Sequence, residues 1–211
     1  VINSLDIPLD SLPSIKPSMF NYGTNEGILK NVPITAVLGD QQASLFGQNC
    51  ISSGDVKNTY GTGCFALTNT GSDIVHSNNG LLSTVAYQKD GDKPQYAIEG
   101  SVSIAGAAVQ WLRDNLNIIK ESSDVEALAM AEKDNGDVYF VPAFSGLFSP
   151  HWDETARGVL VGLSRFSNKS HIARAVLESV AYQSNELLEF MEKDIGITFE
   201  SVNVDGGMVV N

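Results

Sequence analysis

Residues 56–65 read Val-Lys-Asn-Thr-Tyr-Gly-Thr-Gly-Cys-Phe, and Gly61 and Gly63 divide this stretch into two short runs. Both runs contain β-branched or aromatic residues, which favour strands. Short runs of this kind on either side of a glycine turn are typical of a β-hairpin. We therefore expect strands at residues 56–60 and 64–69, joined by a tight turn at residues 61–63.

The same turn has the composition of a phosphate-binding loop. Thr62 stands between two glycines, so backbone amides and the Thr62 hydroxyl can point at one spot. That arrangement suits the β- and γ-phosphates of a nucleotide. An ordinary hairpin turn is the alternative, and for an isolated Gly-Thr-Gly it is the commoner one. The turn is not a P-loop, because no Gly-x-x-x-x-Gly-Lys-Ser/Thr occurs in the sequence.

Further strands and helices are expected on both sides of the hairpin. Turn residues bound two more β-prone runs, at 81–88 and 95–99, which predicts an antiparallel meander over residues 55–100. Residues 33–38 form a short apolar run that predicts a buried strand, followed by a helix over 41–48. After the meander we expect a helix over 102–117, a helix opened by a capping box at Ser123 and Glu126, and a strand at 138–141. A long helix capped by Asn168 and ended by Gly196 precedes a last strand, over 199–204.

Two other glycine segments lie at the ends of expected elements. Asp40, in Gly39-Asp40-Gln41-Gln42, is a candidate general base that orients a substrate hydroxyl and accepts its proton late. A helix cap is the alternative for an aspartate in this place. Asp205-Gly206-Gly207 follows the last strand and would allow a nucleoside to approach the backbone closely.

Gly106 lies inside the predicted helix, where glycine costs about 1 kcal/mol relative to alanine. Either a ligand or a second backbone could require the close approach that glycine permits. In the loop over 142–158, Asp153 and Arg157 are interpreted as a structural ion pair. The three histidines are far apart in sequence and have no ligand-like spacing, so a zinc site is not favoured.

Composition limits the classes of protein to consider. The chain has 211 residues, 43% of them apolar and 18% charged, which is typical of a globular protein. A formal charge of −12 argues against a nucleic-acid partner, and no apolar stretch approaches the roughly 20 residues that span a bilayer. Two cysteines, Cys50 and Cys64, predict free buried thiols and a reducing, cytoplasmic setting.

Taken together, the motifs resemble the FGGY carbohydrate kinase family, within the superfamily of sugar kinases, Hsp70 and actin. The matching stretches are GDQQASLFGQ (39–48), KNTYGTGCF (57–65), YAIEGSVSIAGAAVQWLRD (96–114), VPAFSGL (141–147), WDETARG (152–158) and VDGGMVVN (204–211). They follow one another in the family's order over nearly the whole chain after residue 33. Around Asp40 and Thr62 the sequence looks like the members that act on glycerol.

The resemblance implies an α/β fold of the actin-like ATPase (ribonuclease H-like) type, with a mixed sheet flanked by helices and truncated in this chain. It implies Mg²⁺-dependent phosphorylation of glycerol to sn-glycerol 3-phosphate by ATP. Asp40 would be the catalytic base, in contact with glycerol, and could reach Mg²⁺ through a water molecule. Gln41 and Phe65 would be further substrate contacts. The nucleotide contacts carried over from the family are Thr62, Gly63, Gly106, Gln110, Gly207 and Asn211.

The resemblance also implies how the chain is organised. Residues 1–48 would be the end of the N-terminal FGGY domain with the interdomain segment, and residues 49–211 an incomplete C-terminal, nucleotide-binding domain. We therefore expect a piece of a longer protein, inactive as a kinase by itself and a dimer or tetramer when full length. The alternatives are an FGGY kinase acting on another polyol or sugar and a non-catalytic nucleotide-binding module. The pairing of Asp40 with Thr62 argues against the latter, because a module that only binds nucleotide needs no base.

Overall fold

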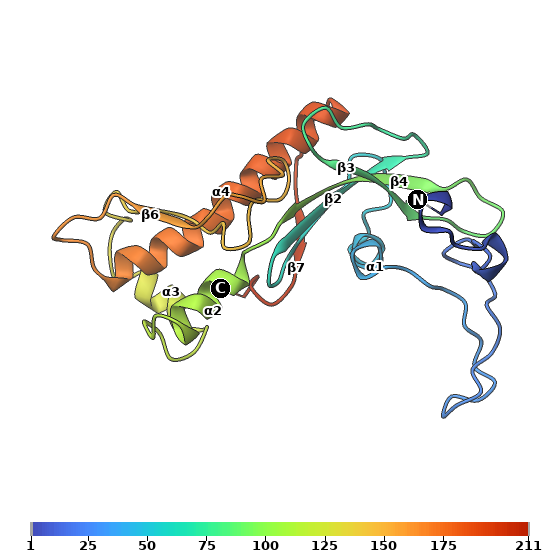
Figure 1. Ribbon diagram of the computed structural model, residues 1–211, viewed down its shortest axis with the longest axis horizontal. Coiled ribbons are helices and arrows are strands. Elements are labelled where there is room, and N and C mark those ends of the chain that lie inside the picture. Colours follow the sequence, from blue (N-terminus) through green and yellow to red (C-terminus); the bar gives the residue numbers. More distant parts are fainter. Residues whose placement is uncertain (1, 211) are drawn as a thin grey trace.

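The computed structural model describes residues 2–210. Two short 3₁₀ helices, Asn3–Leu5 and Leu9–Ser11, precede an extended arm, and the remaining chain forms an elongated α/β body (Figure 1). Among these residues, no helix combines the length and the apolar composition that crossing a bilayer requires.

A five-stranded mixed sheet forms one half of the body. Its strands are β1 (Val56–Tyr60), β2 (Cys64–Gly71), β3 (Leu82–Tyr87), β4 (Gln95–Val102) and β7 (Asn203–Asp205), in the order β3-β4-β2-β1-β7. Strand β7 is parallel to β1, and the other pairings are antiparallel. The hairpin prediction for β1 and β2 is confirmed, but the meander is wrong, because β4 lies between β2 and β3. Strand β4 is largely buried. On β3 the side chains of Leu82 and Val85 are exposed, as expected for a strand at the edge of a sheet.

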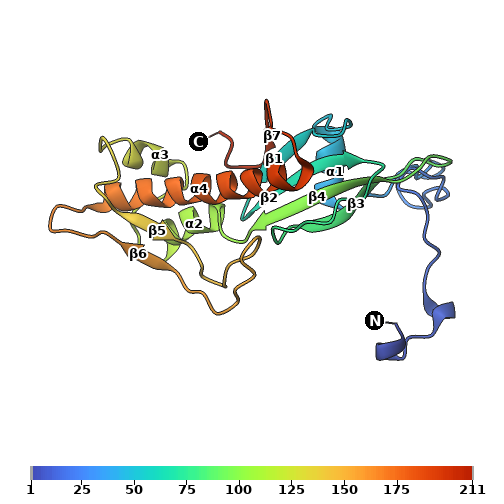
Figure 2. The ribbon, with the colours of Figure 1, turned by 90° about the horizontal axis from the view of Figure 1, so that it is seen from above.

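Helices cover both faces of this sheet, as the predicted fold class requires. Helix α1 (Asp40–Gly47) places Leu45 against Leu67 and Ala97 on one face. On the other face, the second half of α4 (Lys169–Ile195) buries Val180, Leu187 and Met191 against the strands. Figure 2 shows α4 extending well beyond the sheet.

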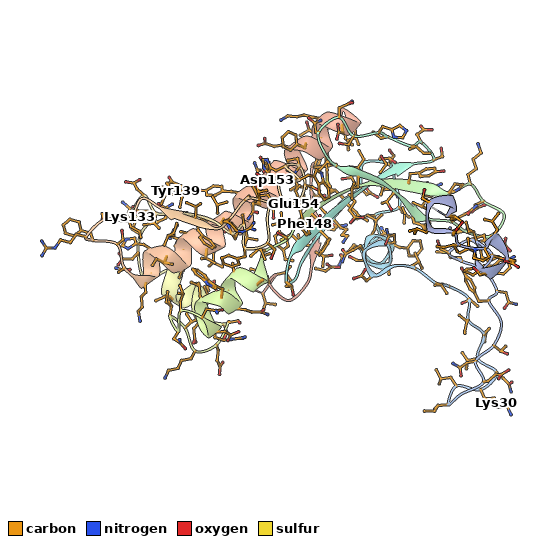
Figure 3. The ribbon with its side chains drawn as sticks, viewed as in Figure 1. Lys30, Lys133, Tyr139, Phe148, Asp153 and Glu154 are labelled. Carbon is orange, nitrogen blue, oxygen red and sulfur yellow. The ribbon has the colours of Figure 1, made fainter. Side chains whose placement is uncertain are left out.

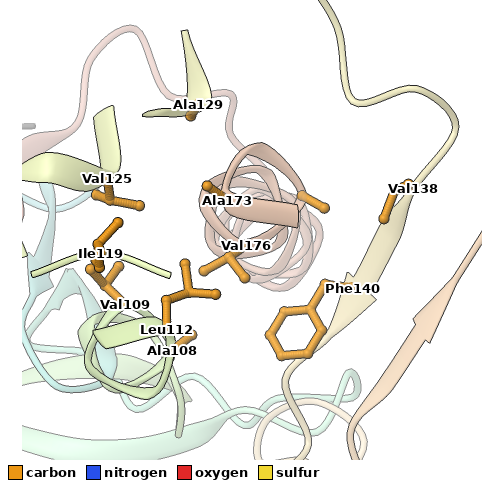
Figure 4. Close-up of a cluster of buried hydrophobic side chains, with 11 residues drawn as sticks. Ala108, Val109, Leu112, Ile119, Val125, Ala129, Val138, Phe140, Ala173 and Val176 are labelled. Atoms are coloured by element: carbon orange, nitrogen blue, oxygen red, sulfur yellow. The ribbon is translucent and has the colours of Figure 1, made fainter. Parts of the chain in front are cut away.

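The first half of α4 belongs to a second hydrophobic cluster. There Ala173 and Val176 pack among side chains of α2 (Gly106–Asp114), α3 (Asp124–Ala129) and β5 (Tyr139–Val141) (Figure 4). Strand β5 pairs with β6 (Val159–Val161) in a small separate sheet. The helix predicted over 102–117 is shorter than expected, because β4 continues to Val102 and Gly106 is the first residue of α2.

Both ends of α4 form as predicted. The Asn168 side chain accepts hydrogen bonds from the amides of Ser170 and His171, and His171 Nδ1 accepts one from the Asn168 amide. Gly196 ends the helix with φ of 72°, in the left-handed region that glycine tolerates. The long helix that joins the two hydrophobic clusters is therefore specified locally.

The predicted buried strand over 33–38 is wrong. Residues 33–37 are exposed, and amide-to-carbonyl bonds such as Tyr22 N to Ile34 O pair this segment with residues 18–25 instead of with the sheet. The result is an arm that leaves the body, with Lys30 near its tip (Figure 3). Several of its apolar side chains are exposed, among them Ile28 and Val37.

Two smaller expectations also have outcomes. Cys50 and Cys64 are free and buried, as predicted, and burial raises the pKa of both thiols. Asp153 and Arg157 do not form the predicted ion pair, although both lie in one loop. Arg157 donates to the carbonyls of Glu154 and Ala156, while Asp153 accepts from Thr155, so neighbouring loop groups satisfy each side chain separately.

Candidate active site

The Gly61-Thr62-Gly63 turn is held against the start of α2 by its carbonyl groups. The Thr62 carbonyl accepts from the amides of Ala105 and Ala107 at 2.8 and 3.1 Å. The Gly61 carbonyl accepts from the Gly106 amide at 3.0 Å. Because both carbonyls are used within the chain, the position of the turn is fixed by α2 and by the β1–β2 ladder.

Glycine is required at two of these positions by close packing of backbone. A Cβ on Gly106 would lie 2.7 Å from the Gly61 carbonyl oxygen, and a Cβ on Gly63 would clash with the Val102 carbonyl oxygen. The sequence left open whether a ligand or a second backbone explained Gly106. The structure supplies a backbone, namely the turn itself, next to the cavity described below.

The third glycine segment closes around the same turn. Gly206 follows β7 with φ of 98°, and a Cβ there would clash with the Tyr60 carbonyl oxygen. The Met208 amide donates to that oxygen at 3.1 Å. By contrast, a Cβ on Gly207 would have no heavy atom of the described residues within 4 Å, apart from its two chain neighbours. Gly206 is therefore needed for the turn, whereas Gly207 leaves open space beside it.

These elements enclose a cavity of about 510 Å³, a volume within the usual range for small-molecule and cofactor sites. It is lined by Gly61, Thr62, Gly106, Val109, Gln110, Ser122, Ser123, Val125, Glu126, Gly207, Met208 and Val210. Four of the predicted nucleotide contacts, Thr62, Gly106, Gln110 and Gly207, thus lie around one space. Gly63 is not among its lining residues, and Asn211 lies outside the described residues.

Sequence reasoning missed the wall that the start of α3 contributes to this cavity. Ser123 and Glu126 were interpreted as a capping box, but the Ser123 side chain makes no capping hydrogen bond. Asp124 instead accepts from the amides of Lys120 and Glu121 at 3.1 and 2.9 Å. The sequence signal for this wall is that residues 122 and 123 are both serine. Polar residues before a helix are too common to identify a binding site.

A second group of predicted residues lies at the start of α1. Asp40 is exposed in the first turn of the helix, and its Oδ1 accepts from the Gln41 amide at 2.9 Å. The Gln41 side chain is half-buried, and Phe65 is half-buried on β2. The cap interpretation of Asp40 is wrong, because Gly39 is the N-cap of α1, no side chain caps the helix, and Asp40 is its first helical residue. Asp40 Oδ2 lies 3.4 Å from the side-chain Nε2 of Gln41.

Strand β1 connects the two groups through a polar network under α1. Ser44 Oγ donates to Asp205 Oδ2 at 2.6 Å and lies 3.3 Å from Thr59 Oγ1. Gln48 Nε2 also donates to Asp205 Oδ2. Burial opposes ionisation of Asp205, but hydrogen bonds from Ser44, Thr59 and Gln48 outweigh it and lower its pKa. The carboxylate that precedes the Gly206-Gly207 turn is thus kept charged.

Lys57 and Glu99 lie on the same face of the sheet, in register across β1, β2 and β4. Burial lowers the pKa of Lys57 from 10.5 to about 8, while Asp205, Glu99, Asp40 and Cys50 act in the opposite direction. Burial raises the pKa of Glu99, an effect that Lys57 reduces. The buried side chain between β1 and the start of α1, Lys57, is therefore a cation that can lose its proton at about pH 8.

The fold and the site define a class of protein: an actin-like α/β domain with a cavity of about 510 Å³ among its glycine turns and an exposed carboxylate at the start of α1. A profile of the FGGY family of carbohydrate kinases, C-terminal domain, matches residues 56–211. The chain belongs to this family.

Individual relatives agree with this assignment. The chain is 58% identical to a glycerol kinase of Brucella anthropi over 212 residues, which is 100% of this chain and 42% of the relative. It is 56% identical to a glycerol kinase of Methylobacterium radiotolerans, again over 100% of this chain and 42% of the relative. The chain thus spans about two fifths of the length of these relatives.

Solved structures show the same fold. The crystal structure of Plasmodium falciparum glycerol kinase with ADP is 39% identical, with a TM-score of 0.88, over 100% of this chain and 43% of that one. A ligand-bound xylulose kinase from Lactobacillus acidophilus is 24% identical, with a TM-score of 0.83 and the same coverage. The latter likeness supports the fold alone.

Proposed function

We propose that this chain carries the acceptor base and the nucleotide cavity of a kinase that phosphorylates glycerol with ATP. The observation that carries the proposal is the cavity of about 510 Å³, around which Thr62, Gly106, Gln110 and Gly207 converge. Identities of 56–58% with glycerol kinases support glycerol as the acceptor. ADP in the related P. falciparum enzyme supports an adenine nucleotide as the donor.

In the proposed reaction, Asp40 orients a hydroxyl of glycerol and accepts its proton as the bond to the γ-phosphorus forms. The bond between the γ-phosphorus and the β–γ bridging oxygen breaks, so ADP leaves and sn-glycerol 3-phosphate remains. Gln41 offers an amide to glycerol, and Phe65 offers an apolar wall. Thr62 and the amides of its turn hold the transferring phosphoryl group, where positioning and charge stabilisation supply most of the catalysis.

Mg²⁺ belongs to the proposal as the ion that accompanies ATP. Among residues 2–210, no group of three or more His, Cys, Asp or Glu side chains could hold a metal ion. Mg²⁺ in kinases is usually held by one or two carboxylates, waters and substrate phosphates, so a complete protein cage is not needed. The exposed carboxylate of Asp40 fits that role through a water molecule, and the ion would neutralise charge on the phosphates.

We further propose that catalysis requires a longer polypeptide, in keeping with the coverage of the relatives. Residues 1–48 and 49–211 would then belong to its N-terminal and C-terminal domains, although α1 packs on the sheet of the second. A cleft with one wall cannot exclude water or align donor and acceptor. We propose that the full-length protein is a cytoplasmic dimer or tetramer and that the 211-residue chain alone is inactive.

The substrate is tested by supplying the full-length protein with ATP, Mg²⁺ and either glycerol or a pentitol, and measuring ADP release. We expect kcat/KM for glycerol to exceed that for every pentitol. A pentitol preferred over glycerol would assign another FGGY kinase. Nucleotide binding with no transfer to any polyol would assign a non-catalytic module.

A further inference from the structure

Lys57 is a buried cation that the proposed reaction has not used. Its side chain is 0% exposed, and among the described residues it is the only charged side chain in the buried class. It extends from β1 toward α1, beneath the residues that begin that helix. An isolated buried ammonium is costly, so its partners must account for its presence.

The three donors of the Lys57 ammonium have three oxygen acceptors. Nζ lies 2.5 Å from Gln41 Oε1, 2.7 Å from Thr59 Oγ1 and 3.2 Å from the Phe65 carbonyl oxygen. None of these acceptors is a carboxylate. A protonated lysine donates three hydrogen bonds, whereas the neutral amine can donate only two. The set of partners therefore matches the charged form.

The contact with Gln41 determines which way its amide faces. Because the side-chain Oε1 of Gln41 accepts from Lys57, the side-chain Nε2 is directed to Asp40 Oδ2, at a long 3.4 Å. The backbone N–H of Gln41 donates to the other carboxylate oxygen, Asp40 Oδ1. A reversed side chain would place its NH₂ group against the ammonium and its oxygen against the carboxylate. Both contacts would then be repulsive, so the cation excludes the reversed orientation.

The contact with Thr59 extends the same network toward the nucleotide cavity. Thr59 Oγ1 accepts from Lys57 and lies 3.3 Å from Ser44 Oγ, which donates to Asp205. Asp205 directly precedes the Gly206-Gly207 turn. One fully buried cation is thus linked to the start of α1 and to the strand that leads into the cavity.

We propose that Lys57 is a positioning residue for phosphoryl transfer, which fixes the Gln41 amide and, through it, the carboxylate of Asp40. This inference rests on the proposed function. The charged groups around Lys57 are Asp40 on α1, Glu99 on β4 and Asp205 on β7, with the Cys50 thiol after α1. Deprotonation of Lys57 removes one donor and allows its nitrogen to accept from a reversed Gln41.

The test uses the full-length kinase with Lys57→Met and, as a matched control, Lys89→Met at an exposed lysine. Loss of a hydrogen bond from a charged donor predicts at least a tenfold fall in kcat/KM for glycerol, with KM for ATP changed less than twofold. The control keeps the wild-type constants. In the wild type, kcat/KM for glycerol also declines as pH rises through about 8, and this decline is absent from Lys57→Met.

A second variant covers the case in which Lys57→Met does not fold. Thr59→Val removes one of the three acceptors, which destabilises the ammonium, so the alkaline decline moves to lower pH. Wild-type values of kcat/KM in Lys57→Met, or an alkaline decline unchanged in either variant, would overturn the inference and leave the glycerol kinase assignment standing. A wild-type protein that phosphorylates no polyol at any pH would instead overturn the proposed function, and the inference with it.

Discussion

Replacing Gly207 by alanine separates ligand binding from folding at the proposed nucleotide cavity. Gly207 lines the cavity, and within residues 2–210 a Cβ there meets no heavy atom within 4 Å other than those of its two chain neighbours. Its φ is outside the left-handed region, so alanine is not strained. The smaller entropy of the unfolded chain predicts a free energy of unfolding raised by about 0.4–1 kcal/mol.

The ligand should respond in the opposite direction. If a nucleoside approaches the backbone at Gly207, the added methyl group takes space that the ligand needs. Overfilling a packed site costs about 1–3 kcal/mol. Since about 1.4 kcal/mol corresponds to a factor of ten, the dissociation constant for ADP should rise between about fivefold and a hundredfold.

Substitutions at two other glycines provide the comparison. ADP binding is measured by calorimetric titration, and stability by denaturant unfolding. Gly47→Ala adds a methyl group to open space at the end of α1, away from the cavity, and should leave ADP binding unchanged. Gly106→Ala places a Cβ 2.7 Å from the Gly61 carbonyl oxygen and should reduce both stability and ADP binding. Unchanged ADP binding by Gly207→Ala would show that no nucleotide lies against Gly207. A loss of stability equal to that of Gly106→Ala would show that the space beside Gly207 is not open.

Three further predictions concern charge, capping and activity. Because burial lowers the pKa of Lys57 from 10.5 to about 8, the unfolded chain binds more protons between these pH values. The free energy of unfolding of the wild type should therefore rise relative to that of Lys57→Met, by up to about 3 kcal/mol from pH 8 to 10.5. The same pH dependence of this free energy in both proteins would contradict the prediction. Asn168→Ala should lower the free energy of unfolding in urea by about 1 kcal/mol, because it removes the side-chain cap of α4. Ser123→Ala should not, because the Ser123 side chain makes no capping hydrogen bond to α3. Equal effects of the two substitutions would show that Asn168 does not stabilise α4 as a cap. The purified 211-residue chain should turn over glycerol no faster than its Asp40→Asn variant, and a faster rate would show that one wall of the cleft suffices.

Local sequence signals predicted much of the fold. The glycine turn and the runs around it gave β1 and β2, and Asn168 and Gly196 marked the ends of α4, because these signals act over a few residues. The position of β4 between β2 and β3 was not accessible in this way. It depends on which strand buries both of its faces, and only the packed sheet determines that.

The failure at residues 33–38 has a similar cause. An apolar β-branched run is compatible with a buried strand, but hydrogen bonding to residues 18–25 carries it into an exposed arm. The site shows the same limit. Thr62, Gly106 and Gly207 were recognisable from their motifs, whereas the role of Lys57 depends on burial and on Gln41, which lies 16 residues away in sequence.

The most direct measurement is glycerol-dependent phosphoryl transfer by the full-length protein and its Asp40→Asn variant, followed by ³¹P NMR, with ADP affinity measured in parallel. We expect the wild type to form glycerol 3-phosphate. We expect the variant to lose this activity by at least a hundredfold, within the usual range for a general base, while binding ADP like the wild type. Transfer by the variant at the wild-type rate would contradict the assignment of Asp40 as the base of this site.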